Sequence, residues 1–215
     1  MQKNPKEITI KLTDFATIEL GYPLHKDRTL FEPYHTYRVY QNPSCTEEAG
    51  TYSYTAPIPE QYLTKEGDII LSTAKLRDVV LITKEQEGLL VSDRYLIIRC
   101  DQNKVHTGYI RYEMLSDAGC EKRRNLCRDA VLPYQKAKKY ADLKIRLPSR
   151  ERQEIMYDML KVFDDFMDSS SKKIRQEQEE REKQHELFIQ ALDSYRGQLL
   201  VYIGENTFVP DDSSD

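Results

Sequence analysis

The chain has 215 residues, of which 39% are hydrophobic and 32% charged, and its formal net charge is −4. A chain of this length can hold one good domain with an appendage, or two small domains. The composition is polar for a compact globule, so it indicates a long solvent-exposed element. The sequence holds no run of about 18 apolar residues and no apolar export signal near its N-terminus, so neither a membrane span nor a secreted protein is expected.

The cysteines indicate reduced thiols rather than a disulfide framework or a metal site. They are Cys45, Cys100, Cys120 and Cys127, and no two of them are spaced as Cys-x-x-Cys. With four histidines and no paired ligands, zinc binding is not expected. We therefore predict a cytoplasmic protein without a metal or a cofactor.

The net charge hides a strong asymmetry along the chain. Residues 121–152 carry 11 Lys and Arg against 4 Asp and Glu, whereas residues 153–215 carry 7 against 15. A local excess of positive charge is what a polyanion-binding surface needs. The alternative is a merely solvated basic surface, but the density of the segment favours binding.

The first 100 residues have the pattern of short β-strands. Alternating apolar residues over 7–20 predict a strand, or a strand and a turn, that ends at Gly21. The segment 22–66 is rich in Tyr, Pro and Thr, and it predicts irregular structure with short strands at 36–41 and 51–55.

Three apolar runs of strand length follow, at 66–71, 78–83 and 89–99. The last run can form one bent strand or a strand pair. Short turns separate the runs, including one around Gly88, and this rhythm predicts a small antiparallel or barrel-like sheet.

Helical patterns begin after residue 105. The spacing of apolar residues predicts a short helix over 106–117, and the basic stretch 119–129 can be a second helix or a loop. Apolar and basic residues then alternate over 143–147, Leu-Lys-Ile-Arg-Leu, which predicts a strand.

The residues after this strand predict an abrupt change to a long helix. Pro148 cannot donate to a sheet ladder, Ser149 is a good N-cap, and Glu151 favours the positive end of a helix. No further proline occurs up to residue 203, so about 50 helical residues would span ~75 Å. Three serines within 168–173 allow a break as an alternative, and residues 204–215 form an acidic tail.

Apolar residues recur every seven positions along this helix, which indicates a partner helix. The two heptad positions are occupied by Leu160, Met167, Ile174, Arg181, Phe188, Tyr195 and Tyr202, and by Met156, Phe163, Ser170, Glu177, Gln184, Ala191 and Gln198.

Both ends of this series are apolar, while the middle, at 175–186, is almost wholly charged. An antiparallel pair would place the apolar N-terminal half of one helix against the apolar C-terminal half of the other. The alternative is a solvated helix with a frayed middle. The dimerisation residues expected for a pair are Met156, Leu160, Phe163, Met167, Ile174, Phe188 and Tyr195.

Five segments in this order resemble the specificity (S) subunit of type I restriction-modification systems, in a half-length form with one target-recognition domain and one spacer helix. The similar segments are KLTDFATIELG (11–21), GDIILSTAK (67–75), EGLLVSDRYLIIR (87–99), VHTGYIRYEMLSD (105–117) and YADLKIRLPSRERQEIM (140–156).

The resemblance implies an α+β fold: a small mixed or antiparallel β-rich recognition domain at 1–148, then a long coiled-coil helix at 149–203. It also implies a non-catalytic DNA reader that directs methyltransferase and restriction subunits to a bipartite site. The partners expected are double-stranded DNA, these two subunits, and a second copy paired through antiparallel helices. A two-fold protein would read an interrupted palindrome.

Binding to DNA needs cations on phosphates and other side chains on base edges. For phosphate contacts we predict Lys122, Arg123, Arg124, Arg128, Lys136, Lys138 and Lys139. For base reading we predict Thr73, Lys75, Arg77, Tyr134 and Gln135.

The sequence offers no set of catalytic residues. It has no Asn/Asp-Pro-Pro-Tyr methylase motif, no Gly-x-x-x-x-Gly-Lys loop, and no convincing nuclease partner for Lys84 and Glu85. Two interpretations other than a working half-subunit remain. One is a coiled-coil adaptor that binds protein and not DNA, and the other is a truncated remnant of a longer specificity subunit.

Overall fold

The computed structural model describes residues 8–25, 34–41 and 50–206, and for 168, 197 and 199–206 it describes the backbone only. The chain divides into two compact units, Met1–Leu160 and Lys161–Asp215. Cys45 and most of the predicted acidic tail lie outside the described residues.

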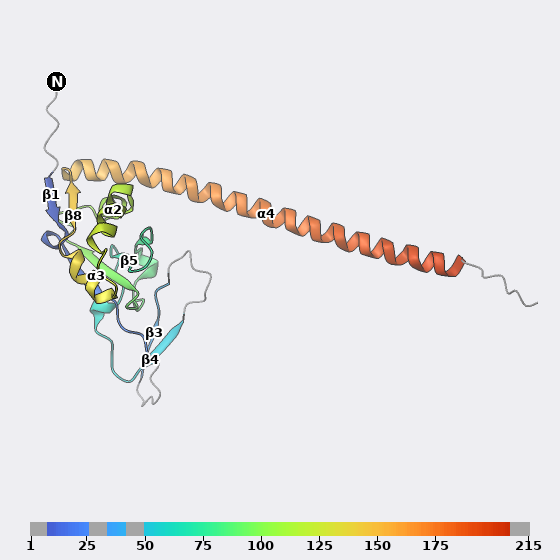
Figure 1. Ribbon diagram of the computed structural model, residues 1–215, viewed down its shortest axis with the longest axis horizontal. Coiled ribbons are helices and arrows are strands. Elements are labelled where there is room, and N and C mark those ends of the chain that lie inside the picture. Colours follow the sequence, from blue (N-terminus) through green and yellow to red (C-terminus); the bar gives the residue numbers. More distant parts are fainter. Residues whose placement is uncertain (1–7, 26–33, 42–49, 207–215) are drawn as a thin grey trace, which may run out of the picture. The chain divides into compact units, whose positions relative to one another are not determined.

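The first unit is built on a four-stranded antiparallel sheet in the order β2-β7-β5-β6 (Figure 1). These strands are β2 (Ala16–Leu20), β7 (Tyr95–Cys100), β5 (Ile69–Ser72) and β6 (Val79–Leu81). Both faces are buried, which explains the continuous apolar runs of the sequence. Ile69, Leu71, Leu96 and Ile98 belong to one core cluster, and Ile70 and Ile97 belong to another.

Two further strand pairs complete the β-structure, one between segments far apart in the sequence and one between neighbouring segments. β1 (Ile8–Lys11) pairs antiparallel with β8 (Lys144–Leu147), so the two ends of the domain lie side by side (Figure 1). β3 (His35–Arg38) pairs antiparallel with β4 (Thr51–Tyr54). A strand is confirmed in each predicted segment, but the segment 7–20 forms two strands, β1 and β2, that belong to different sheets. The run 89–99 contributes the single strand β7 at its end and isolated bridges at Leu90 and Ser92.

Three short helices follow β7: α1 (Thr107–Leu115), α2 (Asp117–Leu126) and α3 (Pro133–Tyr140). The segment that could be a helix or a loop is therefore helical. Ser116 explains its start, because the Ser116 hydroxyl accepts from the Gly119 N–H at 3.0 Å. Single 3-10 turns lie at Leu12–Asp14, Glu60–Tyr62 and Lys84–Gln86.

Helix α4 runs without interruption from Arg150 to Asn206, so the alternative break at 168–173 is wrong. The Ser169 hydroxyl donates to the Asp165 carbonyl at 2.7 Å, one turn earlier, which lets a weak helix former stay inside the helix. The helix starts directly after Ser149, as predicted, and includes residues 204–206 of the predicted tail.

The first turns of α4 belong to the first unit because Gln153 anchors them. Gln153 is 1% exposed, its Oε1 accepts from the His106 N–H at 2.8 Å, and its Nε2 donates to the Pro148 carbonyl at 2.9 Å. Beside it, the Tyr157 ring lies over Gly108, where a Cβ would come within 2.2 Å of the ring. The start of α4 is thus attached to the rest of the first unit by the buried Gln153 amide and by the packing of the Tyr157 ring on the Gly108 backbone.

Replacing Gln153 with Ala should destabilise the recognition domain by about 2 kcal/mol, because two buried backbone groups lose their partners. Urea unfolding of the full chain, followed by tyrosine fluorescence, measures the change. The exposed neighbour Arg152→Ala is the matched control. Equal midpoints for the two variants would contradict the anchoring role.

Candidate nucleic-acid interface

The loop between β5 and β6, residues 73–78, is held in one conformation by its own hydrogen bonds. The Ser72 hydroxyl accepts from the backbone N–H groups of Ala74 at 3.2 Å and Lys75 at 3.1 Å. Ser72 N donates to the Asp78 carbonyl at 3.0 Å, and Asp78 N donates to the Lys75 carbonyl at 3.1 Å. The loop is therefore preorganised before it meets any ligand.

Three other elements hold the same loop from outside. Both the N–H and the hydroxyl of Thr73 donate to the Arg94 carbonyl at 2.9 Å, just before β7. The Lys136 ammonium, on α3, donates to the Thr73 carbonyl. The Arg123 guanidinium, on α2, donates to the Leu76 carbonyl. The β5–β6 loop, α2 and α3, which hold the predicted DNA contacts, are thus joined directly.

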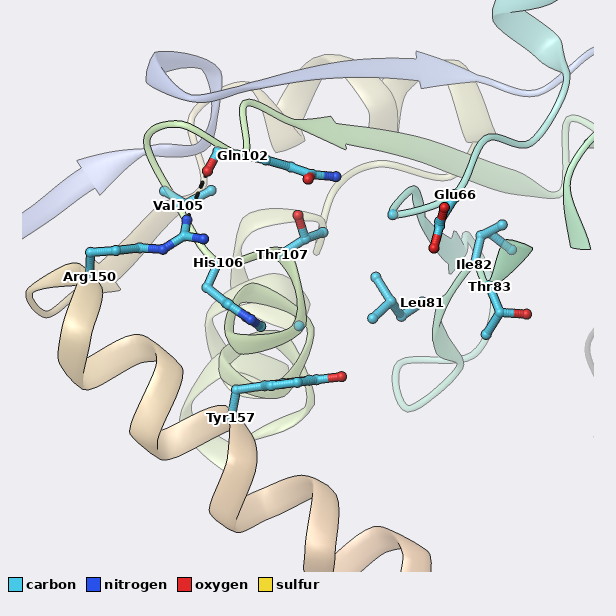
Figure 2. Close-up of a pocket in the computed structure, with 12 residues that line it drawn as sticks. Glu66, Leu81, Ile82, Thr83, Gln102, Val105, His106, Thr107, Arg150 and Tyr157 are labelled. Carbon is cyan, nitrogen blue, oxygen red and sulfur yellow. Dashed lines mark hydrogen bonds between the residues drawn. The ribbon is translucent and has the colours of Figure 1, made fainter. Parts of the chain in front are cut away.

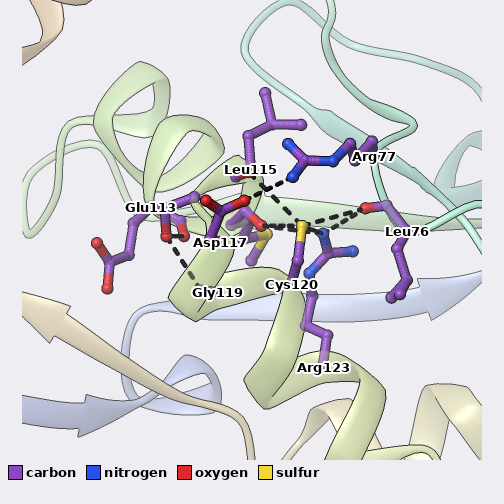
Figure 3. A network of polar contacts seen from close by, with 10 residues as sticks. Leu76, Arg77, Glu113, Leu115, Asp117, Gly119, Cys120 and Arg123 are labelled. Carbon is purple, nitrogen blue, oxygen red and sulfur yellow. Dashed lines mark hydrogen bonds and ion pairs between the residues drawn. The ribbon is translucent and has the colours of Figure 1, made fainter.

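Arg123 is buried and cannot contact a phosphate, so its assignment as a DNA contact is corrected. It is 1% exposed, and its Nη2 also donates to the Met114 carbonyl at 2.9 Å (Figure 3). Burial raises the pKa of the nearby Tyr140 phenol, and the Arg123 charge opposes that rise. Arg123 is a structural cation that connects α1, α2 and the loop.

Three more predicted residues are occupied by structural contacts. The Gln135 Oε1 accepts from the N–H groups of Val131 at 3.0 Å and Leu132 at 3.1 Å, so this amide caps the start of α3. The Thr73 hydroxyl is bonded to Arg94, and the Lys136 ammonium is bonded to Thr73. These side chains position the loop.

The remaining predicted cations near the loop are exposed. Arg77 forms an ion pair with Asp117 at 2.5 Å, and both border a hollow of 420 Å³ that Arg124 and the acidic Glu121 also line. The Lys138 ammonium lies 5.8 Å from the ring centre of Tyr134, which is 49% exposed. Five predicted cations are exposed near the loop: Lys75, Arg77, Arg124, Lys138 and Lys139.

Two predicted cations lie in other contacts. Lys122 is 3.9 Å from Glu113, a buried carboxylate that also pairs with Arg146 at 3.3 Å. Arg128 donates to the Asn125 side chain at 3.0 Å near the end of α2. Both stay on the surface, but part of the Lys122 charge is balanced.

Sequence reasoning missed three exposed residues next to this surface. Arg94 is exposed and holds Thr73 through its carbonyl, and Val131 and Leu132 are 82% and 47% exposed at the start of α3. Exposed apolar side chains beside cations suit contacts with thymine methyl groups or sugars. An apolar pair directly before a lysine-rich helix is the signal that could have indicated them.

A second hollow of 530 Å³ lies where α4 begins, and no predicted site residue lines it (Figure 2). Its lining includes one acidic residue, Glu66, and one basic residue, Arg150. The Arg150 Nη1 donates to the Gln102 carbonyl at 2.9 Å. His106 and Tyr157 lie at its edge with ring centres 4.4 Å apart.

Within the described residues, no group of three His, Cys, Asp or Glu side chains could hold a metal ion. None of the described helices is long and apolar enough to cross a membrane.

The structure is similar to the HsdS subunit from Thermoanaerobacter tengcongensis, with 11% identity and a TM-score of 0.51 over 79% of this chain. The chain has the HsdS fold. This confirms the predicted α+β class and, at the level of fold, the resemblance to type I specificity subunits.

The structure is also similar to a second solved structure, with 12% identity and a TM-score of 0.51 over 79% of this chain. That structure comes from work on complex assembly and conformational transition of the type I R-M system. The matches cover 40% and 41% of those longer chains, so this chain spans about two fifths of their length. No protein-family model matches the sequence, and no curated protein matches it.

The same substitution should strongly destabilise the protein at Arg123 and have little effect on its stability at the neighbouring Arg124. Arg123→Met leaves two carbonyls without their donor and should lower the free energy of unfolding by about 2–4 kcal/mol. Arg124→Met, at an exposed position, should change it by less than about 0.5 kcal/mol. Urea denaturation of both variants measures this, and a stable Arg123→Met protein would contradict the structural role.

The His106 ring should make the stability of the domain depend on pH. Its Nδ1 accepts from the Tyr109 N–H at 3.3 Å and so caps α1. Burial, and then the Arg150 charge, lowers the pKa of His106, so between the two pKa values the unfolded chain binds more protons than the folded one. Stability should therefore fall as the pH drops below about 6.5.

His106→Asn keeps a capping oxygen without a titrating ring, so it should flatten that fall. The measurement is the free energy of unfolding between about pH 7.5 and 5.5. His185→Asn, at an exposed position on α4, is the control and should keep the wild-type slope. A variant at position 106 with an unchanged slope would refute the assignment.

Proposed function

We propose that this chain is a DNA-recognition subunit of a type I restriction-modification system, in a half-length form that works as a homodimer. Each copy reads one half of a bipartite site and directs methyltransferase and restriction subunits to it. The single observation that carries the proposal is a preorganised loop, held by hydrogen bonds from Arg123 and Lys136, that presents cations beside those of α2 and α3 on a domain with the HsdS fold.

The arrangement of the loop suits sequence reading rather than general attraction to polyanions. A rigid backbone fixes the directions from which Lys75 and Arg77 leave the loop, and the pairing with Asp117 further restricts Arg77. Arginine held in one orientation can donate two hydrogen bonds to guanine in the major groove. The cations of α2 and α3 would meanwhile hold the phosphates and set the register.

The proposed surface predicts DNA binding that weakens steeply with salt. Replacing Lys75, Arg77, Arg124, Lys138 and Lys139 with Ala should lower affinity for a duplex at least about tenfold and reduce the slope of log K against log salt by roughly one per lost phosphate contact. Fluorescence anisotropy between about 50 and 200 mM salt measures both quantities.

The control is the pair Lys65→Ala and Lys84→Ala, because these residues lie at the opposite end of the β5–β6 hairpin from the loop. It should leave the salt slope unchanged. Salt-independent or undetectable binding by the wild-type chain would instead support the adaptor interpretation. Sequences selected from a random duplex library should show an interrupted palindrome, and co-expression with a modification subunit should methylate that motif.

A further inference from the structure

Helix α4 keeps a stripe of large apolar side chains exposed in the single chain. Leu160, Phe163, Met167, Phe188 and Tyr195 are between 39% and 63% exposed, and all lie at the two heptad positions. Exposed apolar side chains at heptad spacing mark an interaction surface. Further exposed apolar side chains, among them Met159 and Phe166, lie outside these two positions, and the series itself is polar in its middle. The stripe alone does not specify the orientation or the register of the helix that covers it.

Two charged residues inside the stripe supply this information. Glu177 and Arg181 occupy the same two heptad positions as the apolar residues, at the polar middle of the helix. In a parallel, unstaggered pair each heptad position meets its own copy, so Glu177 would face Glu177 and Arg181 would face Arg181. An antiparallel pair instead brings the two positions against each other, and opposite charges meet twice.

We infer that the α4 helices of the proposed homodimer, paired antiparallel, take the register that places Glu177 against Arg181 of the partner subunit. This inference rests on the homodimer in the proposed function and deepens it by fixing the pairing. Charged residues at heptad core positions specify register and orientation at some loss of stability. The charged pair would therefore align a seam whose middle is polar and whose two ends are apolar.

The residues outward from this pair are mixed at first and apolar on both helices farther out, so the charged pair is what distinguishes the register. Continuing in both directions pairs Ile174 with Gln184, Ser170 with Phe188, Met167 with Ala191 and Phe163 with Tyr195. A shift by one heptad would instead place Arg181 against Ser170 or Gln184, and Glu177 against Ile174 or Phe188. Those registers leave both charges facing neutral side chains, which costs free energy in a desolvated seam.

Charge reversal tests the pairing directly. Glu177→Lys and Arg181→Glu should each raise the dimer dissociation constant at least about tenfold, because like charges then meet across the seam. An equimolar mixture of the two variants should recover dimers. In the mixed pair the introduced lysine faces the introduced glutamate, and the unchanged Arg181 of one variant faces the unchanged Glu177 of the other. Light scattering and native mass spectrometry, with one variant carrying a mass tag, measure both outcomes.

The control reversals are Glu179→Lys and Arg175→Glu, which change the same charges at positions outside the seam and should leave dimerisation unchanged. Circular dichroism confirms that each variant keeps its helix. A monomeric wild-type chain, single reversals without effect, or a mixture that stays monomeric would each overturn the inference. DNA binding is measured separately by anisotropy, so failure of this pairing is distinguishable from failure of DNA reading.

Discussion

The buried guanidinium of Arg123 is the interaction on which the candidate site depends. It joins the end of α1, through the Met114 carbonyl, to the β5–β6 loop, through the Leu76 carbonyl. Both of these hydrogen bonds use the Arg123 Nη2, whereas the buried Nε and Nη1 have no hydrogen-bond partner among the described residues. Removing Nη2 would leave two carbonyls without their donor, so this one nitrogen stabilises the arrangement of helix and loop. The free energy that fixes the loop is therefore part of the folding free energy of the domain.

This arrangement has a consequence for binding. A loop that must be ordered on binding loses affinity to conformational entropy, whereas a loop ordered on folding does not. Lys136 and Arg123 donate to carbonyl groups of the loop, so these two cations have a structural role. The exposed cations beside them remain available to bind a ligand. The basic segment thus contains two kinds of residue that have the same chemistry and different roles.

The spacing of apolar residues predicted most of the strands and helices, because an element with one or two buried faces carries apolar side chains at regular intervals. The β5 and β7 runs and the helix at 107–115 were found in this way. Charge alone could not separate Arg123 from Arg124, because adjacent helical positions point in different directions and only packing decides which one is buried. For the same reason the sequence could not show that Gln135 and Thr73 are used by their own backbone surroundings.

The root and the register of α4 together determine what a paired molecule could read. Gln153 fixes the first turns of the helix to the recognition domain, so the helix start and the domain move together. In the proposed antiparallel pairing, a slip of one heptad changes the separation of the two helix starts by about 10 Å, at 1.5 Å per residue. That equals roughly three base pairs at 3.4 Å each, so a slipped pair would read half-sites at the wrong spacing. An apolar seam alone tolerates such slips, since neighbouring heptads look alike. A charged pair at the centre of the seam disfavours such slips, because a slipped pair would leave both charges without an opposite charge. The polar middle of the helix would thus fix the spacing of the two half-sites.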